Sequence, residues 1–251
     1  RREEVREQLR GDEAAIDLVC DSARDAVRGS DLVILAMPTG VMADVVSAIE
    51  AEDLVEGVLF TDVGSVKESV LKEVAPLVEE KGGCFIGSHP MAGSEKVGLE
   101  NAEKALFKGA SVILTPSHAE KENTPELERL TRFWESLGGI VSVRSASEHD
   151  GIVASISHLP HLVAAALVRS VLKEGADLAA FCGGGFRDTT RVAGGPEEMW
   201  SGILTDNQPA VLDQLEQLIE ELESWKEALD HLDREQLRAF LSESRVLRES
   251  L

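Results

Sequence analysis

Five short apolar runs, separated by polar stretches with helical periodicity, occupy the first 145 residues of this 251-residue chain. The expected strands are Leu32–Met37, Val58–Thr61, Cys84–Ile86, Ser111–Leu114 and Ile140–Val143. The expected helices are Met42–Ile49, Val66–Glu79 and Pro125–Leu137. This alternation is typical of an α/β sheet, whose ligands bind beyond the carboxyl ends of the strands. The functional stretches at those ends, which we expect to converge on one ligand crevice, are Met37-Pro38-Thr39, Asp62 to Ser65 and Ser88 to Glu95.

The pattern becomes purely helical from about residue 146 onward. One apolar stripe with three- and four-residue steps runs through Val211, Leu212, Leu215, Leu218, Ile219, Leu222, Trp225 and Leu229. Asp233 followed by Gln236 resembles a capping box that opens a last helix. We therefore expect residues 146–251 to form an all-helical domain, whose long apolar stripes must be buried. They could be buried against a second protomer or inside a self-contained helical bundle.

The composition limits the possible partners. The formal charge is −21, which argues against nucleic acids and anionic membranes and requires a concentrated local cluster for any anionic ligand. No apolar run approaches the ~20 residues that span a bilayer. The three cysteines, Cys20, Cys84 and Cys182, are odd in number and lack a metal-type spacing. They are typical of free thiols in a reducing compartment, so we expect a soluble cytoplasmic protein.

The stretch from Cys84 to Glu95 contains the first candidate for chemistry, His89. The apolar run at its start predicts a strand, Gly87 allows a turn or a close approach, and Pro90 blocks an immediate helix. We therefore expect His89 to leave the strand and enter a ligand-binding loop. The alternative is a surface loop with an ordinary solvated histidine, since a lone histidine says little about catalysis.

A second stretch, Gly183-Gly-Gly-Phe-Arg-Asp-Thr-Thr-Arg191, combines three glycines with two arginines four residues apart. On a helix, Arg187 and Arg191 share a face, and the glycines expose backbone N–H groups at its positive end. Two guanidinium groups there suit a carboxylate or phosphate. The alternative is a flexible turn followed by a helix with two surface arginines.

Four blocks, in order along the chain, resemble the prephenate dehydrogenase family, which includes the arogenate dehydrogenases. The blocks are Asp62-Val-Gly-Ser-Val-Lys67, Gly87-Ser-His-Pro-Met-Ala-Gly-Ser-Glu95, Ser157-His-Leu-Pro-His161, and Gly183 to Arg191 with Trp200 nine residues on. The resemblance implies a Rossmann-like dinucleotide-binding domain over residues 1–145. It also implies an all-helical substrate-binding and dimerisation domain over residues 146–251, giving a homodimer.

The resemblance is incomplete at the start of the chain. Members of this family open with a strand and a Gly-x-Gly-x-x-Gly turn that holds the dinucleotide pyrophosphate. This sequence opens instead in an expected polar helix, Arg1 to Arg10, and contains no such fingerprint. We expect a fragment that lacks the first βαβ unit, rather than a protein that has lost its cofactor site.

The resemblance implies NAD(P)-dependent oxidative decarboxylation of prephenate to 4-hydroxyphenylpyruvate, with release of CO₂, in tyrosine biosynthesis. NAD is favoured over NADP. His89 would accept the proton of the ring hydroxyl, with Ser65 beside it. The implied substrate-binding residues are Arg191, Arg187, His161, Ser157, Gly184, Ser94, Glu95 and Trp200. The implied cofactor-binding residues are Met37, Pro38, Thr39, Asp62, Gly64 and Ser65.

Several alternatives remain open. Trp200 could reach the partner's site or anchor the helical core. His149 and Asp150 could be an orienting pair or a helix cap. His158 and His161 have a spacing that can suit metal ligands, but Pro160 between them and the lack of a third ligand disfavour a metal. The whole chain could instead be an arogenate dehydrogenase, another β-hydroxyacid-type dehydrogenase, or a non-catalytic dimeric ligand-binding protein.

Overall fold

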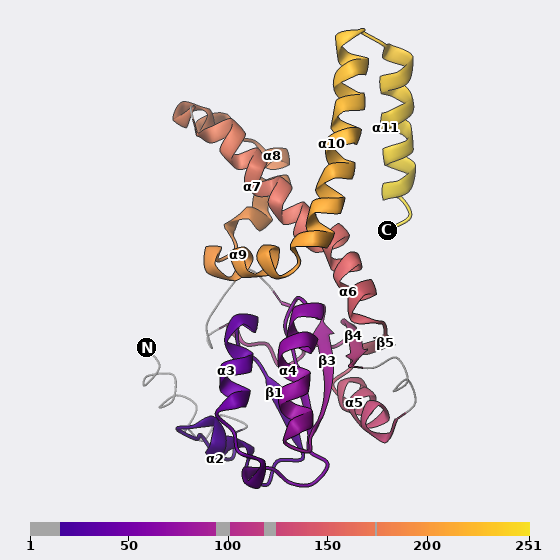
Figure 1. Cartoon of the computed structure of the whole chain (residues 1–251). Coiled ribbons are helices and arrows are strands. Elements are labelled where there is room, and N and C mark those ends of the chain that lie inside the picture. The colour runs from indigo at the N-terminus through magenta and orange to yellow at the C-terminus, as the bar shows by residue number, and fades with distance from the viewer. Residues whose placement is uncertain (1–15, 94–100, 118–123, 174) are drawn as a thin grey trace. The chain divides into compact units, whose positions relative to one another are not determined.

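The computed structural model describes residues 16–93, 101–117, 124–173 and 175–251 (Figure 1). The chain separates into two compact units, Arg1–Asn207 and Gln208–Leu251. The helices that follow the sheet therefore belong, up to Asn207, to the same compact unit as the sheet. The expected helix Arg1 to Arg10 lies outside the described residues. The expected domain boundary after residue 145 remains a prediction.

The first unit contains a five-stranded sheet with the spatial order β1-β2-β3-β4-β5. The strands are β1 (Leu32–Leu35), β2 (Leu59–Asp62), β3 (Cys84–Pro90), β4 (Ser111–Pro116) and β5 (Ile140–Val143). Neighbouring strands are parallel except for the antiparallel pair β3 and β4. All five expected strands are confirmed, with shifted ends in four of them. The carboxyl ends of β1, β2 and β3 lie at one edge of the sheet, as expected.

The third strand is longer than the sequence predicts, and the placement of His89 in a loop is wrong. β3 continues through His89 and Pro90, which pair with Ile113 and Val112 of β4. The antiparallel partner supplies hydrogen bonds that the apolar pattern of Cys84 to Ile86 does not reveal. His89 is therefore held by a strand.

Helices cover both faces of the sheet. On one face, α2 (Ala23–Val27), α3 (Met42–Ser47) and α4 (Glu68–Glu80) enclose a core that includes Phe60 and Phe85. Figure 1 shows α3 and α4 side by side. On the other face, α5 (Pro125–Ser136) packs its Trp134 with residues such as Leu59 and Ile86. Successive residues of β2 and β3 thus enter opposite cores, which explains their continuous apolar runs.

The remaining elements of this unit are helical and short, apart from α7. They are the 3₁₀ helices η1 (Thr39–Val41), η2 (Ala51–Asp53), η6 (Ala176–Phe181) and η7 (Arg191–Gly194), the π-helical turn η5 (Ala154–His158), and the α-helices α6 (Ala146–Val153), α7 (Leu159–Leu172), α8 (Gly184–Thr190) and α9 (Glu197–Asp206). In the described part of the chain, no strand follows β5.

The continuous helical run Ala146–Leu172 corrects the expectation that no segment is long and apolar enough to cross a membrane. It spans 27 residues with a mean hydropathy of 1.7 in its most apolar window. By length and composition alone it meets the requirement for a membrane span, as core helices of soluble proteins also do. The run continues through Pro160, which stands just after the π-helical turn η5, where the regular hydrogen-bond pattern is already interrupted.

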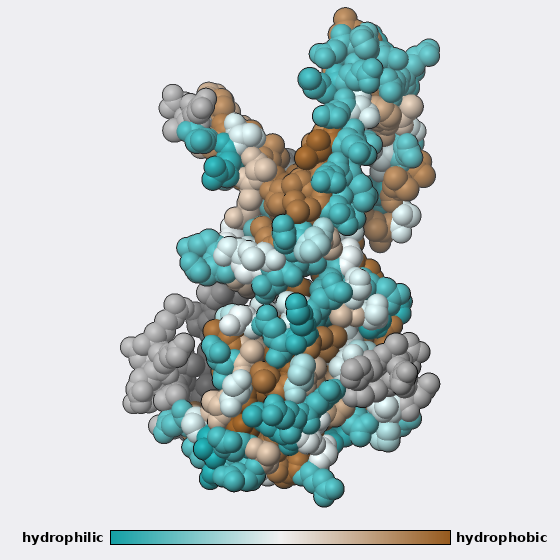
Figure 2. Space-filling model, viewed as in Figure 1, coloured by the Kyte–Doolittle hydropathy of each residue, from teal (hydrophilic) through white to brown (hydrophobic). Residues whose placement is uncertain are grey.

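The second unit is a helical hairpin of α10 (Gln208–Asp230) and α11 (Arg234–Arg248). The side chain of Asp233 accepts hydrogen bonds from the backbone N–H groups of Glu235 and Gln236, which is the N-cap half of the expected capping box. The rings of Trp225 and Phe240 lie 5.1 Å apart between the two helices. Apolar residues remain visible on the surface of this hairpin among mostly polar ones (Figure 2).

Candidate active site

A cavity of about 450 Å³ within the first unit brings together residues from the sheet edge and from the helices. Ser65, after β2, and His89, on β3, line it. Ser157, Arg191 and Trp200, from the helical elements, also line the cavity. These five residues were all predicted as site residues from the sequence. The cavity has the size and the mixture of apolar and convergent polar groups that are typical of a small-molecule site.

His89 is almost entirely buried, with 9% of its surface exposed. Burial lowers the pKa of its imidazole well below 6.5, and the neighbouring His149, Lys67 and His158 lower it further. The ring is therefore neutral at physiological pH. A neutral imidazole at a cavity wall can accept a proton, which is the requirement for a general base.

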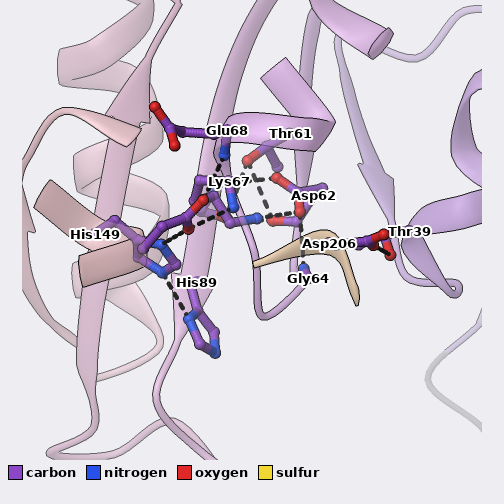
Figure 3. A network of polar contacts seen from close by, with 11 residues as sticks. Thr39, Thr61, Asp62, Gly64, Lys67, Glu68, His89, His149 and Asp206 are labelled. Carbon is purple, nitrogen blue, oxygen red and sulfur yellow. Dashed lines mark hydrogen bonds and ion pairs between the residues drawn. The ribbon is translucent and has the colours of Figure 1, made fainter. Parts of the chain in front are cut away.

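Two residues, His149 and Asp150, link His89 to the start of α4 (Figure 3). Nδ1 of His89 lies 2.8 Å from Nε2 of His149, and Nδ1 of His149 lies 2.7 Å from Oδ1 of Asp150. The Asp150 carboxylate also accepts hydrogen bonds from the backbone N–H groups of Lys67 and Glu68, at 2.8 and 2.9 Å. His149 and Asp150 are both buried. Of the two alternatives that the sequence left open, a cap for their own helix is wrong, because α6 begins at Ala146 and its N-cap is Ser145. Asp150 instead holds His149 and the first backbone N–H groups of α4.

A π-helical turn places Ser157 at the cavity and His158 beside it. The turn η5 interrupts the helix between α6 and α7, and such turns are frequently found at functional sites. The amide Nδ2 of Asn207 donates to Nδ1 of His158 at 3.0 Å and to the Asp150 carbonyl at 2.9 Å. His158 Nε2 consequently carries the proton of the neutral ring and is buried without a partner among the described atoms. His158 also lines the cavity.

Trp200 stacks on His161 within the same chain. The two rings are 3.5 Å apart and nearly parallel, with an angle of 10°. Gly195 permits this arrangement, because a Cβ atom there would lie 2.4 Å from Nε1 of Trp200. Burial lowers the pKa of His161, opposed by a hydrogen bond with the Val192 backbone. His161 supports the cavity wall from behind Trp200 and is not itself among the residues that line the cavity.

The remaining predicted substrate residues lie elsewhere or outside the described residues. Nε of Arg187 donates to the carbonyl of Cys182, and neither Arg187 nor Gly184 lines the cavity. α8 ends at Thr190 and Arg191 opens η7, so the two arginines do not belong to one helix as predicted. Ser94 and Glu95 fall outside the described residues.

The loop after β2 is held by a buried ion pair. Nζ of Lys67 contacts Oδ2 of Asp62, and both side chains are fully buried. Burial lowers the pKa of Lys67, opposed by Asp62. The Asp62 carboxylate also accepts the backbone N–H groups of Gly64 and Ser88. Asp62, predicted to bind cofactor, is therefore committed to shaping the loop.

The edge formed by β1 and β2 fits a dinucleotide. Met37, Pro38 and Thr39 follow β1, and Gly64 stands opposite them after β2. A Cβ atom on Gly64 would lie 2.9 Å from Oδ2 of Asp62 and 3.0 Å from Cγ2 of Thr39, so a glycine is needed for this close approach. Oγ1 of Thr39 is fixed by Oδ2 of Asp206 at 2.7 Å (Figure 3). Backbone exposed beside a glycine, at the carboxyl end of parallel strands, suits a nucleotide.

Among the described residues, no three His, Cys, Asp or Glu side chains are placed to hold a metal ion together. His158 is instead hydrogen bonded to Asn207.

Two family models match this chain and together cover nearly all of it. The nucleotide-binding domain of prephenate dehydrogenase matches residues 4–143, and the dimerization domain of prephenate dehydrogenase matches residues 145–243. The chain belongs to the prephenate dehydrogenase family. Both expected halves of the fold, the Rossmann-like domain and the helical domain, are those of this family.

Individual members of the prephenate dehydrogenase family agree in sequence. A cyclohexadienyl dehydrogenase of Zymomonas mobilis is 35% identical over 241 residues, which are 94% of this chain and 80% of that protein. A prephenate dehydrogenase of Lactococcus lactis is 32% identical over 239 residues, which are 93% of this chain and 65% of that protein. The chain therefore spans slightly less than two thirds of the Lactococcus enzyme.

Solved structures agree as well. Prephenate dehydrogenase from Aquifex aeolicus, in complex with hydroxyphenyl propionate and NAD⁺, superposes with a TM-score of 0.84 and 32% identity, covering 94% of this chain and 82% of that one. Arogenate dehydrogenase from Synechocystis superposes with a TM-score of 0.77 and 29% identity, covering 99% of this chain and 86% of that one.

Proposed function

We propose that this protein oxidises prephenate to 4-hydroxyphenylpyruvate with release of CO₂ in tyrosine biosynthesis, using NAD(P). The observation that carries the proposal is a buried, neutral His89 at a cavity wall that Arg191 also lines. Prephenate carries a ring hydroxyl and two carboxylates, so its site needs one base and fixed positive charge. The cavity supplies both.

His89 acts as the base at the ring hydroxyl. Its Nε2 accepts the hydroxyl proton while hydride leaves the ring carbon that bears this hydroxyl. The bond to the ring carboxylate then breaks, its electron pair completes the aromatic ring, and the proton returns to the phenolate oxygen. A positioned general base is worth about 10²- to 10⁴-fold in rate. Ser65, which lines the cavity next to His89, orients the same hydroxyl.

Arg191 holds a substrate carboxylate, aided by Ser157, which lines the same cavity. Guanidinium pairs with carboxylate through two parallel hydrogen bonds, which fixes orientation as well as charge. Trp200, backed by His161, forms an aromatic wall for the substrate ring. Arg187, Gly184, Ser94 and Glu95 remain proposed substrate residues on the strength of the family resemblance.

Met37, Pro38, Thr39, Gly64 and Ser65 hold the dinucleotide at the edge of β1 and β2, with Asp62 and Lys67 fixing the loop from below. When bound, the nicotinamide supplies the hydride acceptor. NAD is the favoured form, as in the Aquifex aeolicus complex. The glycine backbone after β2 allows close approach, while Thr39 offers a hydroxyl at the same edge.

The working protein is a cytoplasmic homodimer with a dinucleotide domain in residues 1–145 and a helical domain in residues 146–251. What supports the dimer is the match to a dimerization domain, together with large apolar side chains that a single chain leaves exposed. Phe181 is 83% exposed and Leu222 is 57% exposed. A second protomer is a natural cover for such residues.

Arogenate is the second candidate substrate, because the similar Synechocystis enzyme is an arogenate dehydrogenase. Arogenate has an amino group where prephenate has a keto group. The test is a spectrophotometric assay of the full-length protein with each substrate and each of NAD⁺ and NADP⁺, with CO₂ measured in parallel. We expect prephenate with NAD⁺ to give the highest kcat/KM and one CO₂ per NADH. A higher kcat/KM with arogenate would show that arogenate, and not prephenate, is the substrate. Inactivity with both would reject the function.

A further inference from the structure

The contacts behind His89 specify which of its two ring nitrogens carries the proton. We propose that His149 and Asp150 lock His89 in the tautomer with hydrogen on Nδ1, leaving the lone pair of Nε2 for the cavity. The catalytic role of that lone pair rests on the proposed function. The assignment of the tautomer rests on the hydrogen bonds alone. His149 and Asp150 are not among the residues that line the cavity, so they are positioning residues.

Asp150 determines which atoms donate and which accept in the series of hydrogen bonds from Asp150 through His149 to His89. Its Oδ1 accepts the backbone N–H of Lys67, and its Oδ2 accepts the backbone N–H of Glu68. Peptide N–H groups are always donors, so both carboxylate oxygens already serve as acceptors. The proton in the 2.7 Å contact between Asp150 and His149 therefore belongs to Nδ1 of His149.

The direction continues through His149 to His89. We assign His149 as a neutral ring within this proposal. Because its Nδ1 donates to Asp150, its Nε2 then accepts. Its partner at 2.8 Å is Nδ1 of His89, which must donate. The proton of the neutral His89 ring is thereby used, and its Nε2 is bare. Figure 3 shows that nitrogen on the side of the ring turned away from His149.

The same contacts prepare the site for the charge that develops during the reaction. When His89 takes up a proton at Nε2, its Nδ1–H donates more strongly to His149, which in turn donates to Asp150. The two backbone N–H groups that open α4 keep Asp150 in place throughout. Dipoles that are fixed before the reaction need no reorganisation during it, which is the basis of electrostatic preorganisation.

Two substitutions of His149 test its two hydrogen bonds separately, the one with His89 and the one with Asp150. In His149→Gln, the amide oxygen reaches the position of the original Nε2 and still accepts from His89. In His149→Asn, the shorter amide reaches the position of Nδ1, still donates to Asp150 and leaves His89 without its acceptor. Both variants remove the ring and introduce the same functional group, so they control for each other. His231→Asn, at an exposed histidine, is the reference substitution.

The experiment is ¹H–¹⁵N NMR of the full-length enzyme with ¹⁵N-labelled histidine, which distinguishes protonated from bare ring nitrogens. The His89 signals are assigned as those lost in His89→Asn. We expect hydrogen on Nδ1 and a bare Nε2 in the wild type, in His149→Gln and in His231→Asn. His149→Asn should give a mixture of tautomers. A wild-type His89 with hydrogen on Nε2 would overturn the inference, whether or not the variants fold.

Steady-state kinetics give a second readout. We expect His149→Asn to lower kcat by about 10- to 100-fold, a part of the range for a general base, with KM nearly unchanged. His149→Gln should lower kcat by less than about tenfold, because it keeps the acceptor for His89. Equal losses in the two variants would contradict the tautomer lock. If prephenate is not turned over at all while the NMR result holds, the proposed function fails and the tautomer assignment stands.

Discussion

At the scale of single residues, burial rather than sequence neighbourhood decides the chemistry. His89 and His158 are both buried at the cavity, and burial is the largest cause of the lowered pKa of each. Arg191, in η7, lines the same cavity and is exposed. The cavity thus combines neutral imidazoles with one guanidinium, which separates the proton acceptor from the carboxylate anchor.

Arg191→Ala should raise KM for prephenate and leave KM for the dinucleotide nearly unchanged. Truncating one partner of a charge-assisted pair costs about 2–5 kcal/mol, which corresponds to roughly 30-fold or more in affinity. Arg132→Ala is the matched comparison, because Arg132 is an exposed arginine of α5 that does not line the cavity. We expect a much smaller effect there. A rise in the dinucleotide KM of Arg191→Ala would assign this arginine to the cofactor instead.

The free energy of unfolding should fall as the pH decreases below 6.5. Burial lowers the pKa of His158 from 6.5 to about 4, against the opposing charge of Asp150 and together with His149 and His161. The unfolded chain therefore binds more protons than the folded protein between these pH values, so stability is lost over that interval. The measurement is urea unfolding at several pH values. His158→Asn should reduce the slope, and an unchanged slope would contradict the assignment.

At the scale of elements, the antiparallel pairing of β3 and β4 carries His89 to the sheet edge. Gly87 allows it, because a Cβ atom there would lie 2.4 Å from Oγ1 of Thr115 on β4 and 3.1 Å from Cδ of Lys67. β3, β4 and the side chain of Lys67 thus come together at Gly87. Close approach is thus the reason for glycine at this position.

Gly87→Ala should destabilise the fold by about 1–3 kcal/mol, the usual cost of overpacking a core. Gly151→Ala is the matched control, since a Cβ atom on this helical glycine meets nothing within 4 Å. It should be neutral or stabilising, because glycine inside a helix costs about 0.5–1 kcal/mol relative to alanine. Thermal unfolding of both variants provides the measurement. Equal stability of the two would show that the space at Gly87 is not limiting.

Most elements could be predicted from the sequence, because strands buried on both faces give continuous apolar runs and amphipathic helices give a 3.6-residue period. The end of β3 could not, since Ser88, His89 and Pro90 carry no strand signal and depend on β4 for pairing. The strand pattern already indicated Ser65, and the glycine-arginine stretch indicated Arg191. Ser157 and Trp200 could be placed only through a family resemblance. His149, Asp150 and Asn207 act through hydrogen bonds between segments 57 to 83 residues apart, which no local pattern reveals.

At the scale of the whole molecule, the exposed apolar side chains of the helical segments require a cover. On α10, Ile219, Leu222 and Leu229 are exposed to solvent in the single chain. The proposed homodimer would bury them, because an obligate interface resembles a protein core. Assembly and activity are then linked.

Replacing Leu215 and Leu222 with Asp should break the dimer and lower activity, although neither residue lines the cavity. A charge placed in an apolar interface is costly unless it is paired. Light scattering at low micromolar concentration measures the mass. Glu220→Asp with Glu223→Asp, on the same helix, is the matched control and should remain dimeric. A fully active monomeric wild type would contradict the dimer.

The central claim is that His89 is the base for oxidation of prephenate in this cavity. The most direct measurement is kcat of His89→Asn in the full-length enzyme at saturating prephenate and NAD⁺, with dinucleotide affinity measured by fluorescence. We predict a loss in kcat of at least about 100-fold, because a general base contributes that much, and an almost unchanged dinucleotide affinity. A His89→Asn enzyme with kcat near that of the wild type would contradict the account.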